Sequence, residues 1–217
     1  MRNSFDPRIV PGEVADVIRA CQDRVRCRLG GGAALSGAYL GHRATHDVDL
    51  VCRHSADVRS LVRDLPNIAD QTGTRITLVR DAGTFIRASV ATRSSTLELD
   101  AVFEATPPIE EGASLDGIAL ESLADLRASK LTCILSRSEP RDLVDLLFLD
   151  RAGYHPENDL SLALQKDGGI DPGILAWLLG QFPLEPLPVM LIAVTRDDLA
   201  NFRDSLRERF RKIALPS

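Results

Sequence analysis

The sequence predicts an α+β fold, in which a small α/β core with one sheet flanked by helices is followed by an α-helical C-terminal region. Between residues 75 and 103, three strand-like segments follow one another, with short polar gaps that favour antiparallel neighbours. From Ser122 onward, apolar residues recur at helical spacing, except in a glycine loop near residue 168 and a proline-rich stretch over 183–188. The length of 217 residues allows one large domain or two small ones.

Hydrophobic periodicity sets the order of elements in the first half. It predicts a helix over about 9–20, whose first turn accommodates Pro11. Further helices are expected over 33–40 and over 56–65, the latter with Ser55 as its N-cap. The expected strands cover residues 27–29, 47–52, 75–80, 85–90 and 96–103.

The second half is predicted to be helical. One amphipathic helix covers 123–135, and another follows Ser138 as its N-cap, with Pro140 in the first turn. Residues 196–211 are expected to form a surface helix with one apolar face, and Trp177 is expected to pack in the helical core.

Composition limits the classes of function. The net charge of −5 argues against a general basic coat for nucleic acid, although a local basic site remains compatible with it. No apolar run is long enough to cross a membrane, and the first residues lack the apolar stretch of a secretion signal, so a cytoplasmic protein is expected. The four cysteines form no Cys-x-x-Cys pair and are expected to be buried thiols.

Two aspartates on one predicted strand are the most informative feature. Because strand side chains alternate between faces, Asp47 and Asp49 point the same way, with about 7 Å between them. Such carboxylates repel each other unless a cation lies between them, and Mg²⁺ combines oxygen ligands with water and substrate phosphates. The preceding glycines, Gly31 and Gly32, allow a backbone to approach a phosphate closely. These features predict a metal-assisted phosphoryl or nucleotidyl transferase.

A third acid lies on the last predicted strand. Glu98 and Asp100 share one face of that strand, opposite to Leu97 and Leu99. If this face turns toward Asp47 and Asp49, then Asp100 completes a three-carboxylate cluster able to hold two Mg²⁺ ions. The alternative is that Asp100 is an ordinary solvent-facing strand residue.

A second set of charged residues lies in the helical half. Asp142 and Asp145 share a helix face, and Lys130 lies on the preceding helix, where it could position a triphosphate while an acid orients the nucleophile. By helix physics alone, the favoured alternative is that Arg141 pairs with Asp145 and that Lys130 extends to solvent.

These residues, taken in order, resemble the AbiEii/AbiGii toxin family, whose members have the nucleotidyltransferase fold of the DNA polymerase beta type. The resemblance covers about residues 28–150, and its five motifs match in order and approximate spacing. The motifs are Gly31-Gly32-Ala33-Ala34-Leu35, the run from His42 and Arg43 through Thr45 to Asp47, Asp49 and Leu50, then Leu99-Asp100, Lys130-Leu131, and Arg141-Asp142 with Asp145-Leu146. The family often has Ser or Thr after the glycine pair, where this chain has Ala33.

The resemblance implies a small mixed sheet flanked by helices over residues 1–118 and a helical region over 119–217 that completes the active-site cleft. It also implies a role for each matching residue. Gly31 and Gly32 would cradle the nucleotide phosphates, with Arg43 structural or adjacent to them. Asp47 and Asp49 would hold Mg²⁺, Asp100 is the third acid, Lys130 would contact the triphosphate, and Asp142 or Asp145 would be the downstream acid.

The implied reaction is transfer of a nucleoside monophosphate from an NTP to an acceptor, which would be a tRNA-like RNA or a protein. The family further implies the toxin of a toxin–antitoxin or phage-defence pair, with an antitoxin as partner. The basic residues near the second acid pair are candidates for contacting RNA: Arg127, Lys130, Arg137 and Arg141. The alternatives are a housekeeping nucleotidyltransferase and a non-catalytic nucleotide-binding protein of the same fold.

Overall fold

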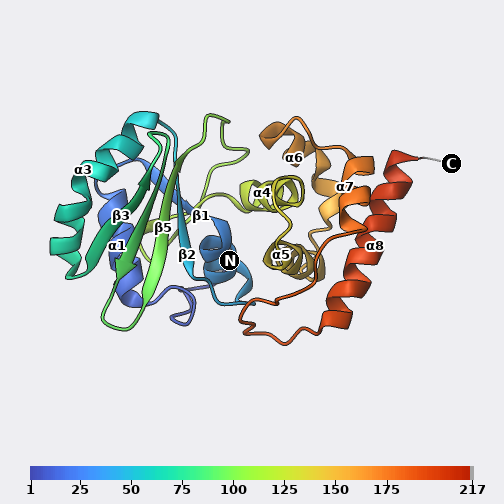
Figure 1. Ribbon diagram of the computed structural model, residues 1–217, viewed down its shortest axis with the longest axis horizontal. Helices are drawn as coiled ribbons and strands as arrows, with labels where there is room; N and C mark the ends of the chain where they lie inside the picture. Colours follow the sequence, from blue (N-terminus) through green and yellow to red (C-terminus); the bar gives the residue numbers. More distant parts are fainter. Residues whose placement is uncertain (216–217) are drawn as a thin grey trace. The chain divides into compact units, whose positions relative to one another are not determined.

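A computed structural model describes residues 1–215 of the chain (Figure 1). The chain divides between Ser122 and Leu123 into two compact units. The first unit contains the sheet and its helices, and the second is helical.

The first unit is built on a five-stranded mixed sheet in the order β1-β2-β5-β4-β3. Strand β2 runs parallel to β5, and the other neighbouring pairs are antiparallel. The strands are β1 (Cys27–Gly30), β2 (Asp47–Cys52), β3 (Arg75–Asp81), β4 (Phe85–Ala91) and β5 (Thr96–Phe103). The predicted fold class, a small mixed sheet flanked by helices, is therefore confirmed. A short hairpin, β6 (Ser114–Leu115) and β7 (Ile118–Ala119), follows the sheet and was not predicted.

One face of the sheet is apolar and is packed by helices α1 (Gly12–Gln22) and α3 (Ser55–Thr72) (Figure 1). The side chains on this face alternate with polar residues along each strand, as expected for a sheet with one buried face. They include Val48, Leu50, Ile86, Ala88, Val90, Leu99 and Ala101, each exposed by 3% or less. The opposite face carries the acidic side chains described below.

The ends of helices α1 and α3 differ from the predicted ends. Helix α1 begins after Pro11, which is its N-cap residue and lies outside the first turn. Helix α3 has His54 as its N-cap residue and runs to Thr72, through Pro66, where the sequence predicted an end at residue 65. Buried Ile68 continues the apolar stripe beyond the proline, so the packing outweighs the backbone hydrogen bond lost there.

The glycine run starts a helix earlier than predicted. Helix α2 (Gly31–Ala34) begins at Gly31, where the sequence predicted a start at residue 33. It continues directly into a wider π-helical segment, η1 (Leu35–Leu40), which ends at Gly41 in the left-handed conformation. This helical segment therefore starts directly after β1.

The second unit is formed by helices, as predicted. These are α4 (Leu123–Ser136), α5 (Pro140–Arg151), the 3-10 turn η2 (Pro156–Asp159), α6 (Leu160–Lys166), α7 (Pro172–Leu179) and α8 (Arg196–Ala214). Glu139, and not Ser138, is the N-cap residue of α5, because Pro140 takes the first helical position. Helix α8 begins with a capping box between Thr195 and Asp198.

The expectation that Trp177 packs in the helical core is wrong, because its side chain is 65% exposed. Helix α7 instead buries Leu175, Ala176 and Leu179. The expectation for the cysteines is confirmed for Cys21, Cys27 and Cys52, which are buried, whereas Cys133 is half-buried. In the part of the chain that the structure describes, no helix is both long and apolar enough to span a membrane.

Candidate functional site

Four carboxylates lie on one face of the sheet in the first unit. The parallel pairing of β2 with β5 places Asp47 opposite Glu98 and Asp49 opposite Asp100. Paired residues on neighbouring strands project from the same face, so Asp47, Asp49 and Asp100 share the face that α1 and α3 leave uncovered. Their side chains are half-buried, while Glu98 is exposed.

Gly31 lies directly against the carboxylate of Asp49. Its backbone is left-handed, with φ of 58°, and a Cβ atom at this position would overlap the Asp49 carboxylate. At Gly32, a Cβ would lie 2.5 Å from Nη2 of Arg43. The two glycines are therefore required by the close approach of Asp49 and Arg43 to the backbone that links β1 to α2.

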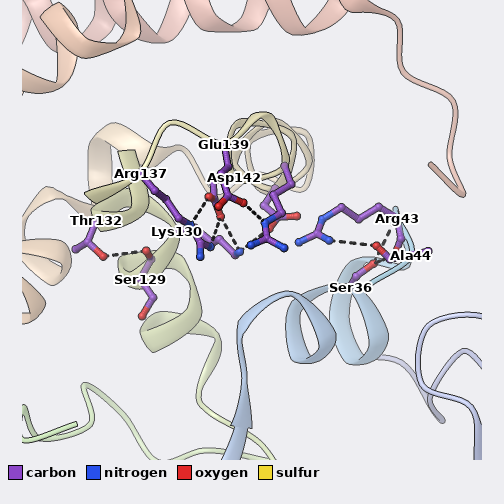
Figure 2. Close-up of polar contacts among 11 residues, drawn as sticks. Ser36, Arg43, Ala44, Ser129, Lys130, Thr132, Arg137, Glu139 and Asp142 are labelled. Atoms are coloured by element: carbon purple, nitrogen blue, oxygen red, sulfur yellow. Dashed lines mark hydrogen bonds and ion pairs between the residues drawn. The ribbon is translucent and has the colours of Figure 1, made fainter. Parts of the chain in front are cut away.

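Arg43 is buried and braced by the π-helical segment. The hydroxyl of Ser36 donates a hydrogen bond to the carbonyl oxygen of Arg43 at 2.7 Å and accepts one from its backbone amide at 3.1 Å (Figure 2). The guanidinium donates to the carbonyl oxygen of Ala44 at 3.1 Å. Ser36 was not among the residues predicted for the site, and its role depends on a tertiary contact with no motif of its own.

Asp100 is held by an arginine of the neighbouring strand. Nε and Nη2 of Arg87 donate to the two carboxylate oxygens of Asp100 at 2.8 and 2.7 Å. Sequence reasoning missed Arg87, although its place in the alternating pattern of β4 puts it on the polar face.

The sheet face fits a cation held by two carboxylates. Within residues 1–215, no three His, Cys, Asp or Glu side chains converge into a metal-binding cluster. Mg²⁺ does not need one, because it commonly binds one or two carboxylates and fills its shell with water and substrate phosphates. Asp47 and Asp49 would supply such a partial shell, next to the turn at Gly31, where a Cβ atom would overlap the Asp49 carboxylate.

In the helical unit, Lys130 contacts two buried aspartates, Asp142, which Figure 2 shows beside it, and Asp145. Its Nζ is 3.0 Å from Oδ1 of Asp142 and 2.7 Å from Oδ2 of Asp145. Arg137 donates to both oxygens of Asp142, at 2.8 and 3.0 Å. Lys130 is 4% exposed and both aspartates are fully buried, so the alternative in which Lys130 extends to solvent is wrong.

The ion pairs of this cluster stabilise the charged forms of Asp142 and Arg137. Burial acts to raise the pKa of Asp142, but the Lys130 charge and the hydrogen bond from Arg137 outweigh it, so the pKa lies below its ordinary value. For Arg137, burial acts to lower the pKa, and the hydrogen bond to Asp142 more than offsets it, so the pKa is raised. Asp142 is therefore ionised at neutral pH.

The four basic residues predicted to contact RNA all form ion pairs inside the helical unit. Arg127 pairs with Asp159, and Arg141 pairs with Glu139. Together with the contacts of Lys130 and Arg137, these pairs account for each of the four cations.

A family model described as "Nucleotidyl transferase AbiEii toxin, Type IV TA system" matches residues 15–215. The chain belongs to the AbiEii nucleotidyl transferase toxin family. The match extends through the sheet unit and the helical unit, and the resemblance predicted from the motifs is thereby confirmed.

Solved structures show the same fold. A nucleotidyltransferase-type protein from H. pylori matches with a TM-score of 0.59 and 22% identity, covering 93% of each chain. The protein JHP933 from Helicobacter pylori matches with a TM-score of 0.58 and 22% identity, covering 94% of this chain and 91% of the other. MenT4, a nucleotidyltransferase toxin from Mycobacterium tuberculosis, matches with a TM-score of 0.55 and 16% identity, covering 93% and 86%. No curated protein matches the sequence.

Proposed function

We propose that this member of the AbiEii family transfers a nucleoside monophosphate from an NTP to an acceptor hydroxyl, with Mg²⁺ held by Asp47 and Asp49. The observation that carries the proposal is the contact of Asp49 with Gly31. It puts a carboxylate suited to a cation beside a backbone that phosphates can approach closely, which is the combination that a metal–nucleotide complex requires.

The residues of the sheet unit would have distinct tasks in this reaction. The backbone of Gly31 and Gly32 would cradle the phosphates, and Arg43 would support this turn through the contact of its guanidinium with Gly32. When bound, Mg²⁺ would neutralise phosphate charge and stabilise the in-line displacement. Asp47 and Asp49 would orient that charge relative to the glycine turn.

The helical unit would contribute Lys130 and one buried acid. Contact between Lys130 and the triphosphate stays a prediction, as does the choice between Asp142 and Asp145 for the acid. Both aspartates contact Lys130, and Asp142 also binds Arg137. These contacts therefore support, for each of the two acids, a role in holding Lys130 in place.

The acceptor is proposed to be an RNA with a tRNA-like end, with a protein hydroxyl as the competing class. A cognate antitoxin is proposed as partner, because the family is described as part of a type IV toxin–antitoxin system. A housekeeping enzyme or a nucleotide-binding protein of the same family would lack this pairing.

Incubation of the purified protein with each α-³²P-labelled NTP, Mg²⁺ and total RNA or lysate tests the proposal. The inactive variant is Asp49→Asn, which removes one charge from the proposed Mg²⁺ site. Its matched control is Asp70→Asn, which makes the same change at an exposed position of α3. Circular dichroism of both variants establishes that the fold is intact.

Label on an RNA or a protein band that is lost in Asp49→Asn and kept in Asp70→Asn supports nucleotidyl transfer and names the acceptor class. Equal labelling by all three proteins contradicts the metal assignment. Absence of label with every NTP, accompanied by NTP binding in equilibrium dialysis, would contradict nucleotidyl transfer and indicate a nucleotide-binding protein without this activity.

A further inference from the structure

Arg87 binds Asp100 in a way that strand register dictates. The antiparallel pairing of β4 with β5 places the two residues directly opposite each other. Each carboxylate oxygen accepts one hydrogen bond from the guanidinium, at 2.8 and 2.7 Å. Paired charge-assisted bonds of this geometry are shorter and stronger than neutral hydrogen bonds and fix the orientation of both groups.

The guanidinium also reaches the other acid of β5. Nη1 of Arg87 lies 3.2 Å from Oε2 of Glu98. Arg87 is thus in contact with the two carboxylates that the register of β2 and β5 sets opposite Asp47 and Asp49. Because a guanidinium is in practice always protonated in proteins, Arg87 places a permanent positive charge beside both acids.

A cation that uses Asp100 as a ligand must compete with this contact. The guanidinium already engages both oxygens of Asp100 and neutralises its charge, and it repels a second cation placed beside it. Asp100 is only 13% exposed, so solvent screens this competition less than it would on an open surface. Asp47 and Asp49 lie on the neighbouring strand β2, one strand farther from β4.

We propose that Arg87 is a positioning residue that withholds Asp100 from the metal site, so that Asp47 and Asp49 bind one divalent cation and a second enters only when Arg87 releases Asp100. The inference rests on the proposed metal-dependent function and deepens it. In this scheme Asp100, the third acid, binds a cation only after Arg87 has released it.

Titration of the full-length chain with Mn²⁺ alone, with free Mn²⁺ measured by electron paramagnetic resonance, tests this without nucleotide or turnover. The wild-type protein is expected to bind one Mn²⁺. Arg87→Gln is expected to bind a second Mn²⁺, or to bind Mn²⁺ roughly 10- to 100-fold more tightly, the usual scale for groups that act on a metal ligand.

Arg80→Gln is the matched control. Arg80 is paired with Arg87 across β3 and β4, so its removal takes the same charge from a neighbouring position without removing an ion pair to Asp100. Arg80→Gln is expected to bind Mn²⁺ like the wild type. If both variants shift the isotherm equally, general electrostatics explains the effect and the inference fails.

Asp100→Asn in the wild-type background provides a second test, which remains valid if Arg87→Gln fails to fold. In the wild-type background it should leave Mn²⁺ affinity within about two-fold, the scatter expected between independent sites. In the Arg87→Gln background it should abolish the added binding. An Arg87→Gln isotherm equal to that of the wild type, or a loss of wild-type affinity of about ten-fold or more in Asp100→Asn, would overturn the inference.

The two proposals fail in different ways. If nucleotidyl transfer is absent but Arg87→Gln gains an Asp100-dependent Mn²⁺ site, the proposed reaction is wrong and the role of Arg87 holds. If transfer occurs and depends on Asp49, but Arg87→Gln has the same Mn²⁺ isotherm as the wild type, only the proposed role of Arg87 is wrong.

Discussion

Replacing Lys130 by methionine should strongly destabilise the helical unit. The Lys130 side chain is 4% exposed and contacts two fully buried carboxylates at 3.0 and 2.7 Å. Methionine keeps most of the volume but removes the charge, and loss of one partner from a buried ion pair costs about 3–5 kcal/mol. For a chain of this size that corresponds to a decrease in Tm of roughly 6–20 °C.

Urea and thermal unfolding followed by circular dichroism measure this loss. The matched control is Arg211→Gln, because Arg211 pairs with Glu208 on the surface of α8, with side chains 58% and 44% exposed. Screening by solvent should limit its effect to below about 0.5 kcal/mol. A loss below about 1 kcal/mol in Lys130→Met would refute the interpretation of Lys130 as part of a buried charge cluster.

A second replacement identifies which carboxylate depends on the lysine. Arg137 still binds Asp142 in Lys130→Met, whereas the 2.7 Å contact of Asp145 with the ammonium is lost. Recovery of free energy by Asp145→Asn in the Lys130→Met background would show that the buried charge of Asp145 depends mainly on Lys130. Further destabilisation in the double variant would show that the carboxylate of Asp145 is stabilised mainly by groups other than Lys130.

Three further predictions concern other parts of the chain. Gly31→Ala should destabilise the protein more than Gly73→Ala: both glycines are left-handed, which costs alanine about 1–2 kcal/mol, but only Gly31 also meets Asp49. Equal losses of unfolding free energy would contradict the close approach. The hydrogen bond from Arg8 lowers the pKa of Asp6 from its ordinary 3.8 to about 2, so the free energy that ionised Asp6 adds to folding is complete above about pH 4 and is lost as pH falls toward 2. Asp6→Asn should flatten that part of the curve of unfolding free energy against pH, and an unchanged slope would refute this. Trp177→Ala should change stability by no more than about 0.5 kcal/mol, and acrylamide should readily quench the wild-type fluorescence, whereas a protected indole would contradict the exposure.

The strands that carry the site could be predicted because apolar and polar side chains alternate along much of their length. Strand β5 has the predicted bounds, 96–103, and in it buried Leu99 and Ala101 flank the polar Asp100. The helix α7 shows the opposite case. Nearly every position from Ile174 to Leu179 is apolar, so periodicity could not indicate which face is buried, and the exposure of Trp177 was missed.

Site residues could be predicted where a motif carries them, and their partners could not. Asp47, Asp49 and the glycine pair belong to local patterns with a physical reason behind their spacing. The contact of Arg87 with Asp100 depends on the register between β4 and β5, which the sequence alone does not determine. The burial of Lys130 likewise depends on how α4 packs against α5, and helix physics favoured the solvent-exposed alternative.

The two sets of aspartates are stabilised in different ways, and this difference suits them to different tasks in the proposed reaction. Asp142 and Asp145 are fully buried and share Lys130, and Asp142 also binds Arg137, so any change of charge in that cluster costs folding free energy. Asp47 and Asp49 lie half-buried on a sheet face next to a glycine turn, where ions and phosphates can exchange with solvent. The proposed reaction requires a metal–nucleotide complex to be loaded and released in every cycle, and of the two sets the sheet carboxylates have that access. The helical cluster is better suited to keeping a lysine charged and fixed in place, which requires the burial and rigidity that exchange with solvent would disrupt.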